Sequence, residues 1–301
     1  MTATTANGLA ADLAGPGLTL VTGPFRSRIR ARLATVAAGL ASLYPPDAFE
    51  PATGFADFHV ALDRPVGARR WYRPQVRFRF DGREVFRPLP RPQAYPMLEW
   101  GLNWCVTTQI NHYLLFHAAV LARAGRALIL PGEPGVGKST LCAALASRGW
   151  ELLSDEIALV ALDTGHLHGL GRPVSLKNAA IDVIRRFAPD AVIGATCHDT
   201  LKGTVAHLRA PRRGALQAAD AACPTWLVFP RFIPGAPTRL QAETRERGFF
   251  RLVDNAFNFT TLGTLAFERT TDLVNRSTCL DLTYSDLEEA VGRLGSLRAA
   301  D

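Results

Sequence analysis

Hydrophobic and polar positions alternate one by one over much of residues 17–92, which is the period of half-buried β-strands. The segments with this period, each predicted to be a strand, are residues 18–22, 25–32, 56–62, 75–80 and 83–86. The last two flank Asp81-Gly82, a dipeptide that favours a tight hairpin turn. Helical spacing over residues 29–43 interrupts the strands. We therefore expect a small β-rich N-terminal region at 17–93, after a disordered Ala/Thr/Gly-rich tail at 1–16.

From residue 94 onward, short apolar runs are interspersed with segments of helical spacing, as is typical of an α/β domain. The predicted helices are residues 94–113, 141–149, 178–187, 245–256, 262–275 and a last one that ends near 297. The predicted strands are residues 114–122, 127–130, 150–154, 157–162, 166–170, 202–208, 226–233 and 279–282. A short turn joins the first two of these strands, so we expect an antiparallel hairpin there and a mixed sheet in a domain that spans 94–301.

The segment that follows the strand at 127–130 fits the phosphate-binding pattern G-x-x-x-x-G-K-[ST] at every fixed position. The residues predicted to bind the phosphates of ATP, here called the phosphate loop, are Gly132, Glu133, Pro134, Gly135, Val136, Gly137, Lys138, Ser139 and Thr140. Glycines let backbone N–H groups turn toward phosphate oxygens, and the helix that follows adds positive partial charge. Lys138 is expected to reach the β- and γ-phosphates, and the Ser139 hydroxyl is expected to ligate Mg²⁺.

The composition is that of a globular protein, with 48% hydrophobic and 20% charged residues. No apolar run approaches the roughly 18 residues of a membrane span, and the first residues lack the basic start and apolar core of a secretory signal. The five cysteines are scattered and form no C-x-x-C pair. These features argue against a zinc site or a disulfide framework, and they favour a reducing cytoplasm.

Basic residues give the chain a net charge of +7, but the arginines are spread along it, so the charge does not favour a nucleic-acid partner. Only three of the 34 basic residues are lysines, namely Lys138, Lys177 and Lys202. A chain that uses arginine for nearly every cation is expected to keep lysine where a compact ammonium group is needed. Because Lys138 belongs to the phosphate loop, Lys177 and Lys202 become candidates for the same site.

Two adjacent acids, Asp155 and Glu156, follow the predicted strand at 150–154 and lie 17 residues beyond Lys138. A carboxylate at this place can attract Mg²⁺ and can accept a proton from a hydroxyl group. A third candidate, His117, lies within the predicted strand at 114–122. On its own, a histidine in a buried strand is more often a hydrogen-bonded core residue than a catalytic one.

Together, the histidine-bearing strand, the phosphate loop, a helix that ends in Arg148-Gly149 and the acid pair resemble the catalytic domain of the bacterial HPr kinase/phosphorylase family. The closest resemblance is to the offshoot called HprK-related kinases, and it covers about residues 112–172. The resemblance implies a nucleotide fold of the phosphoenolpyruvate-carboxykinase-like type and transfer of a phosphoryl group to a serine hydroxyl. By position it implies that Asp155 is the metal-binding residue and base, that Glu156 is the second acid and that His117 is in the active site.

The sequence departs from the family pattern at one metal-binding position. The family has Glu-x-x-Gly-x-Gly, whereas this chain has His166 at the place of the glutamate. Mg²⁺ prefers oxygen ligands to neutral imidazole, so either Glu156 or Asp163 compensates or the metal is held more loosely. The family's C-terminal substrate-binding elements and its usual regulatory domain are not recognisable either.

The sequence therefore predicts an ATP- and Mg²⁺-dependent kinase whose acceptor is a serine or another hydroxyl group on a protein or peptide. Arg172, Lys177 and Lys202 are candidates for charge stabilisation or for acceptor binding. Two alternatives stay open, a small-molecule kinase with the same site and a non-catalytic regulator that binds ATP. The family is also compatible with a homo-oligomer, and no membrane partner is expected.

Overall fold

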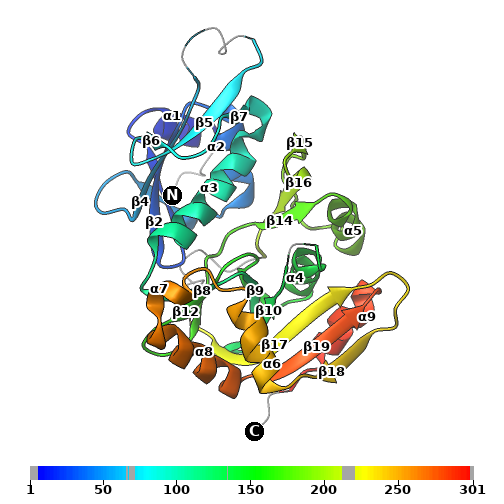
Figure 1. Ribbon diagram of the computed structural model, residues 1–301. Coiled ribbons are helices and arrows are strands. Elements are labelled where there is room, and N and C mark those ends of the chain that lie inside the picture. The colour runs from blue at the N-terminus through cyan, green and yellow to red at the C-terminus, as the bar shows by residue number, and fades with distance from the viewer. Residues whose placement is uncertain (1–5, 66, 68–71, 134, 212–220, 299–301) are drawn as a thin grey trace.

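Two large β-sheets, each covered by helices, make up the protein (Figure 1). The computed structural model describes residues 6–65, 67, 72–133, 135–211 and 221–298. Parallel and antiparallel strand pairs occur in both sheets. The predicted α/β class with mixed sheets is therefore confirmed. Among the described residues, no helix has the length and apolar character needed to cross a membrane.

The N-terminal sheet has the strand order β3-β1-β2-β4-β5-β6, with β7 paired to β5. Its strands are β1 (Leu18–Thr22), β2 (Phe25–Ala31), β3 (Phe49–Pro51), β4 (Phe58–Asp63), β5 (Gln75–Phe80), β6 (Arg83–Glu84) and β7 (Leu89–Pro90). The predicted hairpin is confirmed, because β5 and β6 pair antiparallel around Asp81 and Gly82. Both turn residues have positive φ, 46° and 77°, as a two-residue hairpin turn of this kind requires.

Helices α1 (Ala6–Ala14), α2 (Ala34–Leu43) and α3 (Ala94–Gln109) share one hydrophobic core with this sheet. The prediction of a disordered tail was wrong for residues 6–14, because Leu9 and Leu13 of α1 are buried in that core. Residues 1–5 lie outside the described residues. Because α3 packs against the N-terminal sheet, the core of that sheet extends past residue 93, where the sequence indicated a boundary.

The C-terminal sheet has six strands in the order β11-β9-β10-β17-β19-β18, and β10, β17 and β19 are parallel. Its strands are β9 (Ala118–Arg123), β10 (Arg126–Pro131), β11 (Glu151–Ser154), β17 (Cys223–Phe232), β18 (Arg239–Ala242) and β19 (Thr278–Tyr284). The predicted hairpin between β9 and β10 is confirmed. Because β10, β17 and β19 are parallel, their C-terminal ends lie at the same edge of the sheet, and the phosphate loop follows β10 there.

Helices cover both faces of the six-stranded sheet (Figure 1). On one face lie α4 (Lys138–Ser147), α5 (Ala179–Phe187) and α9 (Leu287–Gly295), and on the other lie α6 (Arg245–Val253), α7 (Phe259–Leu262) and α8 (Thr264–Arg276). Successive residues of β9 face alternate cores, as the pleat of a strand requires: Leu121 packs on the α4 side and Val120 on the α8 side.

Two three-stranded sheets connect these layers. One has the order β13-β12-β8, with β8 (Tyr113–Phe116), β12 (Ala158–Ala161) and β13 (Leu167–His168). The other has the order β14-β16-β15, with β14 (Val174–Lys177), β15 (Cys197–Thr200) and β16 (Gly203–Leu208). The strand predicted at 114–122 is thus two strands that belong to different sheets, and His117 is the residue between them.

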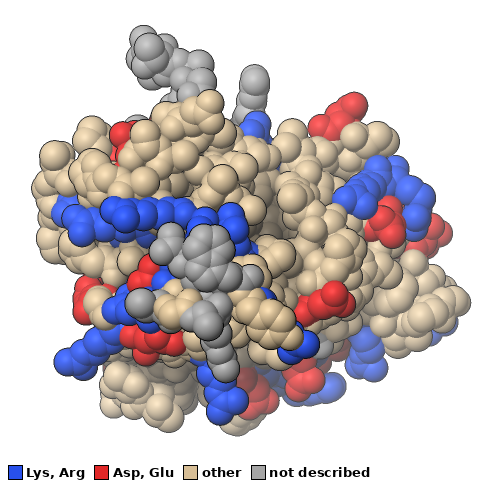
Figure 2. All heavy atoms as spheres, turned by 90° about the horizontal axis from the view of Figure 1, so that it is seen from above, with Lys and Arg blue, Asp and Glu red and all other residues tan. Residues whose placement is uncertain are grey.

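Charged side chains of both signs are mixed over the face seen in Figure 2. The arginines of the exposed side of β2 illustrate this arrangement. Arg26 forms an ion pair with Glu50, with Nε and Oε2 3.3 Å apart, and Arg30 donates from Nε to the Pro16 carbonyl oxygen. Both arginines are therefore engaged in local contacts within the N-terminal region.

Candidate functional site

The phosphate loop connects the C-terminal end of β10 to the N-terminus of α4. Gly132, Gly135 and Gly137 have φ values of 152°, 97° and 94°, a range that favours glycine. At Gly137 there is a second constraint, because a Cβ atom would lie 2.5 Å from Oη of Tyr284. That hydroxyl donates a hydrogen bond to the Gly137 carbonyl oxygen at 3.1 Å. The loop is therefore braced by β19, and Pro134 lies outside the described residues.

Lys138, the first residue of α4, is largely buried beside the loop. Its Nζ donates to the Gly132 carbonyl oxygen at 2.6 Å and lies 3.2 Å from Nε2 of His117. Burial lowers the pKa of Lys138 to about 8, although the nearby carboxylates of Glu156 and Asp155 oppose this shift. The ammonium group is consequently held beside the loop. Its lowered pKa brings the loss of its proton close to physiological pH.

His117 lies opposite Lys138, and its backbone N–H donates to the Asn255 carbonyl oxygen at 2.6 Å. Burial and then the charge of Lys138 lower the pKa of His117 to about 4. The imidazole is therefore neutral at physiological pH. A neutral ring protonated on Nδ1 presents a lone pair on Nε2, so His117 can accept a hydrogen bond from Lys138.

Asp155 immediately follows β11 and is buried. Its Oδ2 accepts a hydrogen bond from the backbone N–H of Ser175 at 2.7 Å, and no described residue forms a hydrogen bond to Oδ1. Burial and the neighbouring Glu156 carboxylate raise the pKa of Asp155 to about 7. A carboxylate with one oxygen fixed and a raised proton affinity is suited to metal binding and to proton transfer.

Glu156 is more fully engaged than its neighbour. Its Oε1 lies 3.7 Å from Nζ of Lys177, and its Oε2 accepts a hydrogen bond from Nδ2 of Asn103. Burial raises the pKa of Glu156, but the charges of Lys202 and Lys177 outweigh that effect, and the pKa lies below its usual value. Glu156 is therefore ionised and has both oxygens occupied by partners.

All three lysines of the chain gather around this acid pair. Lys138 lies at the phosphate loop, and Lys177 pairs with Glu156. Lys202 lies in the turn between β15 and β16, with Nζ 5.1 Å from the centre of the Trp100 ring. The charge of Lys202 acts on both Glu156 and Asp155. The scarcity of lysine in the sequence was therefore a useful signal for the position of the site.

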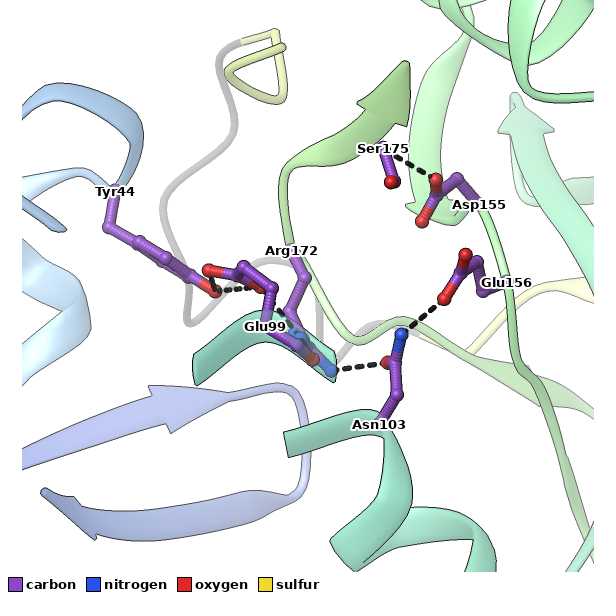
Figure 3. A network of polar contacts seen from close by, with 7 residues as sticks. All are labelled: Tyr44, Glu99, Asn103, Asp155, Glu156, Arg172 and Ser175. Carbon is purple, nitrogen blue, oxygen red and sulfur yellow. Dashed lines mark hydrogen bonds and ion pairs between the residues drawn. The ribbon is translucent and has the colours of Figure 1, made fainter. Parts of the chain in front are cut away.

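Arg172 takes part in a buried polar network that joins the N-terminal helix α3 to the acid pair (Figure 3). Its Nη2 donates to Oε2 of Glu99 at 2.6 Å, and its Nη1 donates to Oδ1 of Asn103 at 2.5 Å. The Tyr44 hydroxyl donates to Glu99 at 3.0 Å, and Asn103 continues the network to Glu156. Arg172 is thus held inside the protein, where it supports the acid pair and does not face an acceptor.

Tyr44, Glu99 and Asn103 were not predicted from the sequence to belong to the site. One local signal was present, because Glu99 is the only charged residue in α3, and Asn103 lies one helical turn after it. A lone carboxylate in an apolar helix needs a buried partner. Nothing in the local sequence indicates that this partner is Arg172, which lies 73 residues further along the chain.

His166 and Asp163 do not join the site. Both lie in or beside the turn between β12 and β13, and β12 separates this turn from the acid pair. Asp163 is exposed and accepts a hydrogen bond from the backbone N–H of Thr164 at 2.7 Å. Of the two residues considered as replacements for the family's glutamate, Glu156 therefore lies at the site and Asp163 does not, and both Glu156 oxygens already have partners.

The arrangement fits Mg²⁺ together with the phosphates of a nucleotide. Ser139 lies in the first turn of α4, and Asp155 has an oxygen to which no described residue forms a hydrogen bond. The described residues contain no group of three or more His, Cys, Asp or Glu side chains placed to hold a metal by themselves. Mg²⁺ commonly binds through one or two protein oxygens plus substrate phosphates, so this donor set is of the expected kind.

Comparison of the sequence with protein-family models gives no match, and comparison with curated proteins gives none either. The resemblance to the HPr kinase/phosphorylase family therefore rests on the residues named above.

Proposed function

We propose that this protein is an ATP-dependent kinase with a phosphoenolpyruvate-carboxykinase-like nucleotide fold, and that it phosphorylates a hydroxyl group on a protein or peptide in the cytoplasm. One observation carries the proposal. Beside a glycine-rich loop at a helix N-terminus, the chain gathers all of its lysines around two adjacent carboxylates, in an arrangement supported by α3. Such a site combines phosphate binding, metal binding and a base, which are the parts that phosphoryl transfer requires.

Each residue has a defined role in the proposed reaction. The phosphate loop and Lys138 bind the β- and γ-phosphates, and Ser139 and Asp155 would hold Mg²⁺, which neutralises phosphate charge when bound. The acceptor oxygen forms a bond to the γ-phosphorus while the bond to the β–γ bridging oxygen breaks. The bond's electron pair leaves with ADP, and Asp155 takes the proton of the hydroxyl group. His117 orients Lys138, and Lys177 and Lys202 offset the charge of the acid pair.

The small size of the cavity beside the acid pair favours a protein or peptide, which can present its hydroxyl group from the surface, over a small molecule enclosed in the site. The cavity lined by Asp155, Arg172, Ser175 and Trp100 has a volume of about 10 Å³. A cavity of that size holds about one water molecule. An acceptor must instead approach from the side of Lys177 and Lys202, where the Lys177 side chain is 32% exposed and Lys202 is exposed to solvent.

The test is to incubate the protein with Mg²⁺, labelled ATP and the proteins encoded beside it, and to locate the label by mass spectrometry. The proposal expects transfer to a serine or another hydroxyl group. It also expects that Asp155→Asn removes transfer while nucleotide still binds, and that Lys138→Ala weakens nucleotide binding itself.

Asp163→Asn is the matched control, because Asp163 is an exposed aspartate in the turn beyond β12. This variant is expected to behave as wild type in both assays. If the wild-type protein binds ATP but transfers no phosphate to any acceptor, including water, the kinase proposal fails and the protein is a nucleotide-binding regulator. Label that appears only on a small molecule would overturn the choice of acceptor.

A further inference from the structure

Two large apolar side chains lie exposed beside the phosphate loop, on the side away from the acid pair. Phe232 ends β17 and is 46% exposed, and Ile233 follows it and is 37% exposed. Strand β17 neighbours β10 on one side, whereas β9 and β11, which lead to His117 and the acid pair, lie on the other side. The phosphate loop therefore lies between a charged region and an apolar one.

The apolar segment is attached directly to the loop. The backbone N–H of Phe232 donates to the Val136 carbonyl oxygen at 3.0 Å. The Phe232 Cβ atom would lie 3.0 Å from a Cβ placed on Gly137, so the side chain begins against the loop backbone. A nucleoside that extends from phosphates bound in the loop can reach this side chain without crossing the acid pair.

The same segment is held firmly by β19. The Ile233 N–H donates to the Tyr284 carbonyl oxygen at 2.9 Å, and the Ser285 hydroxyl donates to the Ala236 carbonyl oxygen at 2.8 Å. The Phe232 ring meets the Tyr284 ring nearly edge to face, with the ring centres 5.7 Å apart. The exposed ring is thus positioned in advance, which lowers the entropy cost of binding a flat ligand against it.

The position also agrees with a general rule for open sheets with parallel strands, where ligands bind just beyond the C-terminal ends of those strands. Here β10, β17 and β19 are parallel, and Phe232 and Tyr284 are the last residues of β17 and β19. Aromatic side chains in such places bind the flat face of a nucleobase, because every base has a π-face that can stack.

We propose that Phe232 and Ile233 form the nucleobase subsite, and that the base of the bound nucleoside triphosphate stacks on the Phe232 ring. This inference rests on the proposed function, because it assumes that a nucleotide binds through the phosphate loop. The nucleotide then spans the loop, with its γ-phosphate toward Asp155 and its base over the end of β17. The base lies far from the atoms that react, and the binding energy gained there would help to position the γ-phosphate.

The test compares two ligands that share the phosphates but differ in the base. The affinities of Mg²⁺-bound AMP-PNP, a non-hydrolysable ATP analogue, and of Mg²⁺-bound inorganic tripolyphosphate are measured by calorimetry. Phe232→Ala is expected to weaken AMP-PNP binding by roughly 5- to 150-fold and to leave tripolyphosphate binding within about 2-fold of wild type. Phe232→Tyr keeps an aromatic face and is expected to retain the affinity for AMP-PNP.

Phe250→Ala is the matched control, because Phe250 is also an exposed phenylalanine, 66% exposed, but lies on α6. It should leave both affinities unchanged. Equal weakening of both ligands by Phe232→Ala would mean that Phe232 only supports the loop, and it would overturn the inference. Equal affinities of the wild-type protein for the two ligands would also overturn the inference, because the base would then add no binding energy. Phosphate binding by the loop would still be supported. If wild type binds neither ligand, the proposed function fails and the subsite fails with it.

Discussion

Arg172 and Glu99 form a buried ion pair in which Nη2 and Oε2 are 2.6 Å apart and the side chains are only 7% and 4% exposed. Glu99 belongs to α3, which packs in the core of the N-terminal sheet, whereas Arg172 precedes β14 beside the phosphate loop helix. The pair therefore joins the N-terminal region to the candidate site. Through Asn103 the connection continues to Glu156 (Figure 3). Helix α3 supports the site as well as the core of the N-terminal sheet.

Removing one partner of this pair is expected to destabilise the fold strongly. Glu99→Ala leaves the guanidinium of Arg172 buried without its carboxylate, and the loss of such a partner costs about 3–5 kcal/mol of unfolding free energy. Unfolding in urea measures the effect. Glu288→Ala is the control, since it removes an exposed carboxylate from the ion pair with Arg148 and is expected to cost less than about 1 kcal/mol. Similar losses in the two variants would contradict a buried structural role for Glu99.

Asn103 is expected to affect turnover more than nucleotide binding. Asn103→Ala removes the hydrogen bond that orients Glu156 and the one that Arg172 donates. Loss of such a supporting contact lowers activity by roughly 10- to 100-fold. We expect kcat to fall by this amount while the Kd for nucleotide changes little. Gln109→Ala, at the exposed end of the same helix, is the control and should leave both values unchanged. A variant whose only change is weaker nucleotide binding would argue against this role.

The sequence predicted those parts of the fold and of the site that depend on interactions between residues close together in the chain. The turn at Asp81-Gly82, the phosphate loop and the acid pair each depend on neighbouring residues, and the structure contains the hairpin and the strand–loop–helix. The support of Glu156 by Asn103 depends on a contact across 53 positions, and no local pattern encodes that distance. The break at His117 was missed for a similar reason, because two short apolar strands in different sheets have the same hydrophobic pattern as one long strand.

The pH profile of kcat/KM is expected to be bell-shaped and narrow. Burial and Glu156 raise the pKa of Asp155 to about 7, so at lower pH the group is protonated and cannot bind Mg²⁺ or accept a proton. Burial lowers the pKa of Lys138 to about 8, so at higher pH the free enzyme loses the charge that attracts phosphate. The rate should therefore rise through about pH 7 and fall above about pH 8.

His117 provides the control for that profile. Because burial and Lys138 lower the pKa of His117 to about 4, the ring stays neutral throughout the range from pH 5 to 8. His117→Asn is therefore expected to reduce kcat/KM without removing the rise near pH 7. Loss of that rise in the variant would assign it to His117 and not to Asp155. Steady-state rates at saturating Mg²⁺ and constant ionic strength measure both profiles.

The first helix is expected to contribute substantially to stability. Leu13 of α1 is only 1% exposed and packs in the core of the N-terminal sheet. Leu13→Ala removes buried apolar volume there, and such changes cost about 2–5 kcal/mol. Leu201→Ala, at a leucine that is 93% exposed, should change the unfolding free energy by less than about 0.5 kcal/mol. Urea unfolding measures the effect of each variant. Deletion of residues 1–15 should destabilise the fold at least as much as Leu13→Ala. If neither Leu13→Ala nor the deletion lowers the unfolding midpoint, α1 does not belong to the stable core.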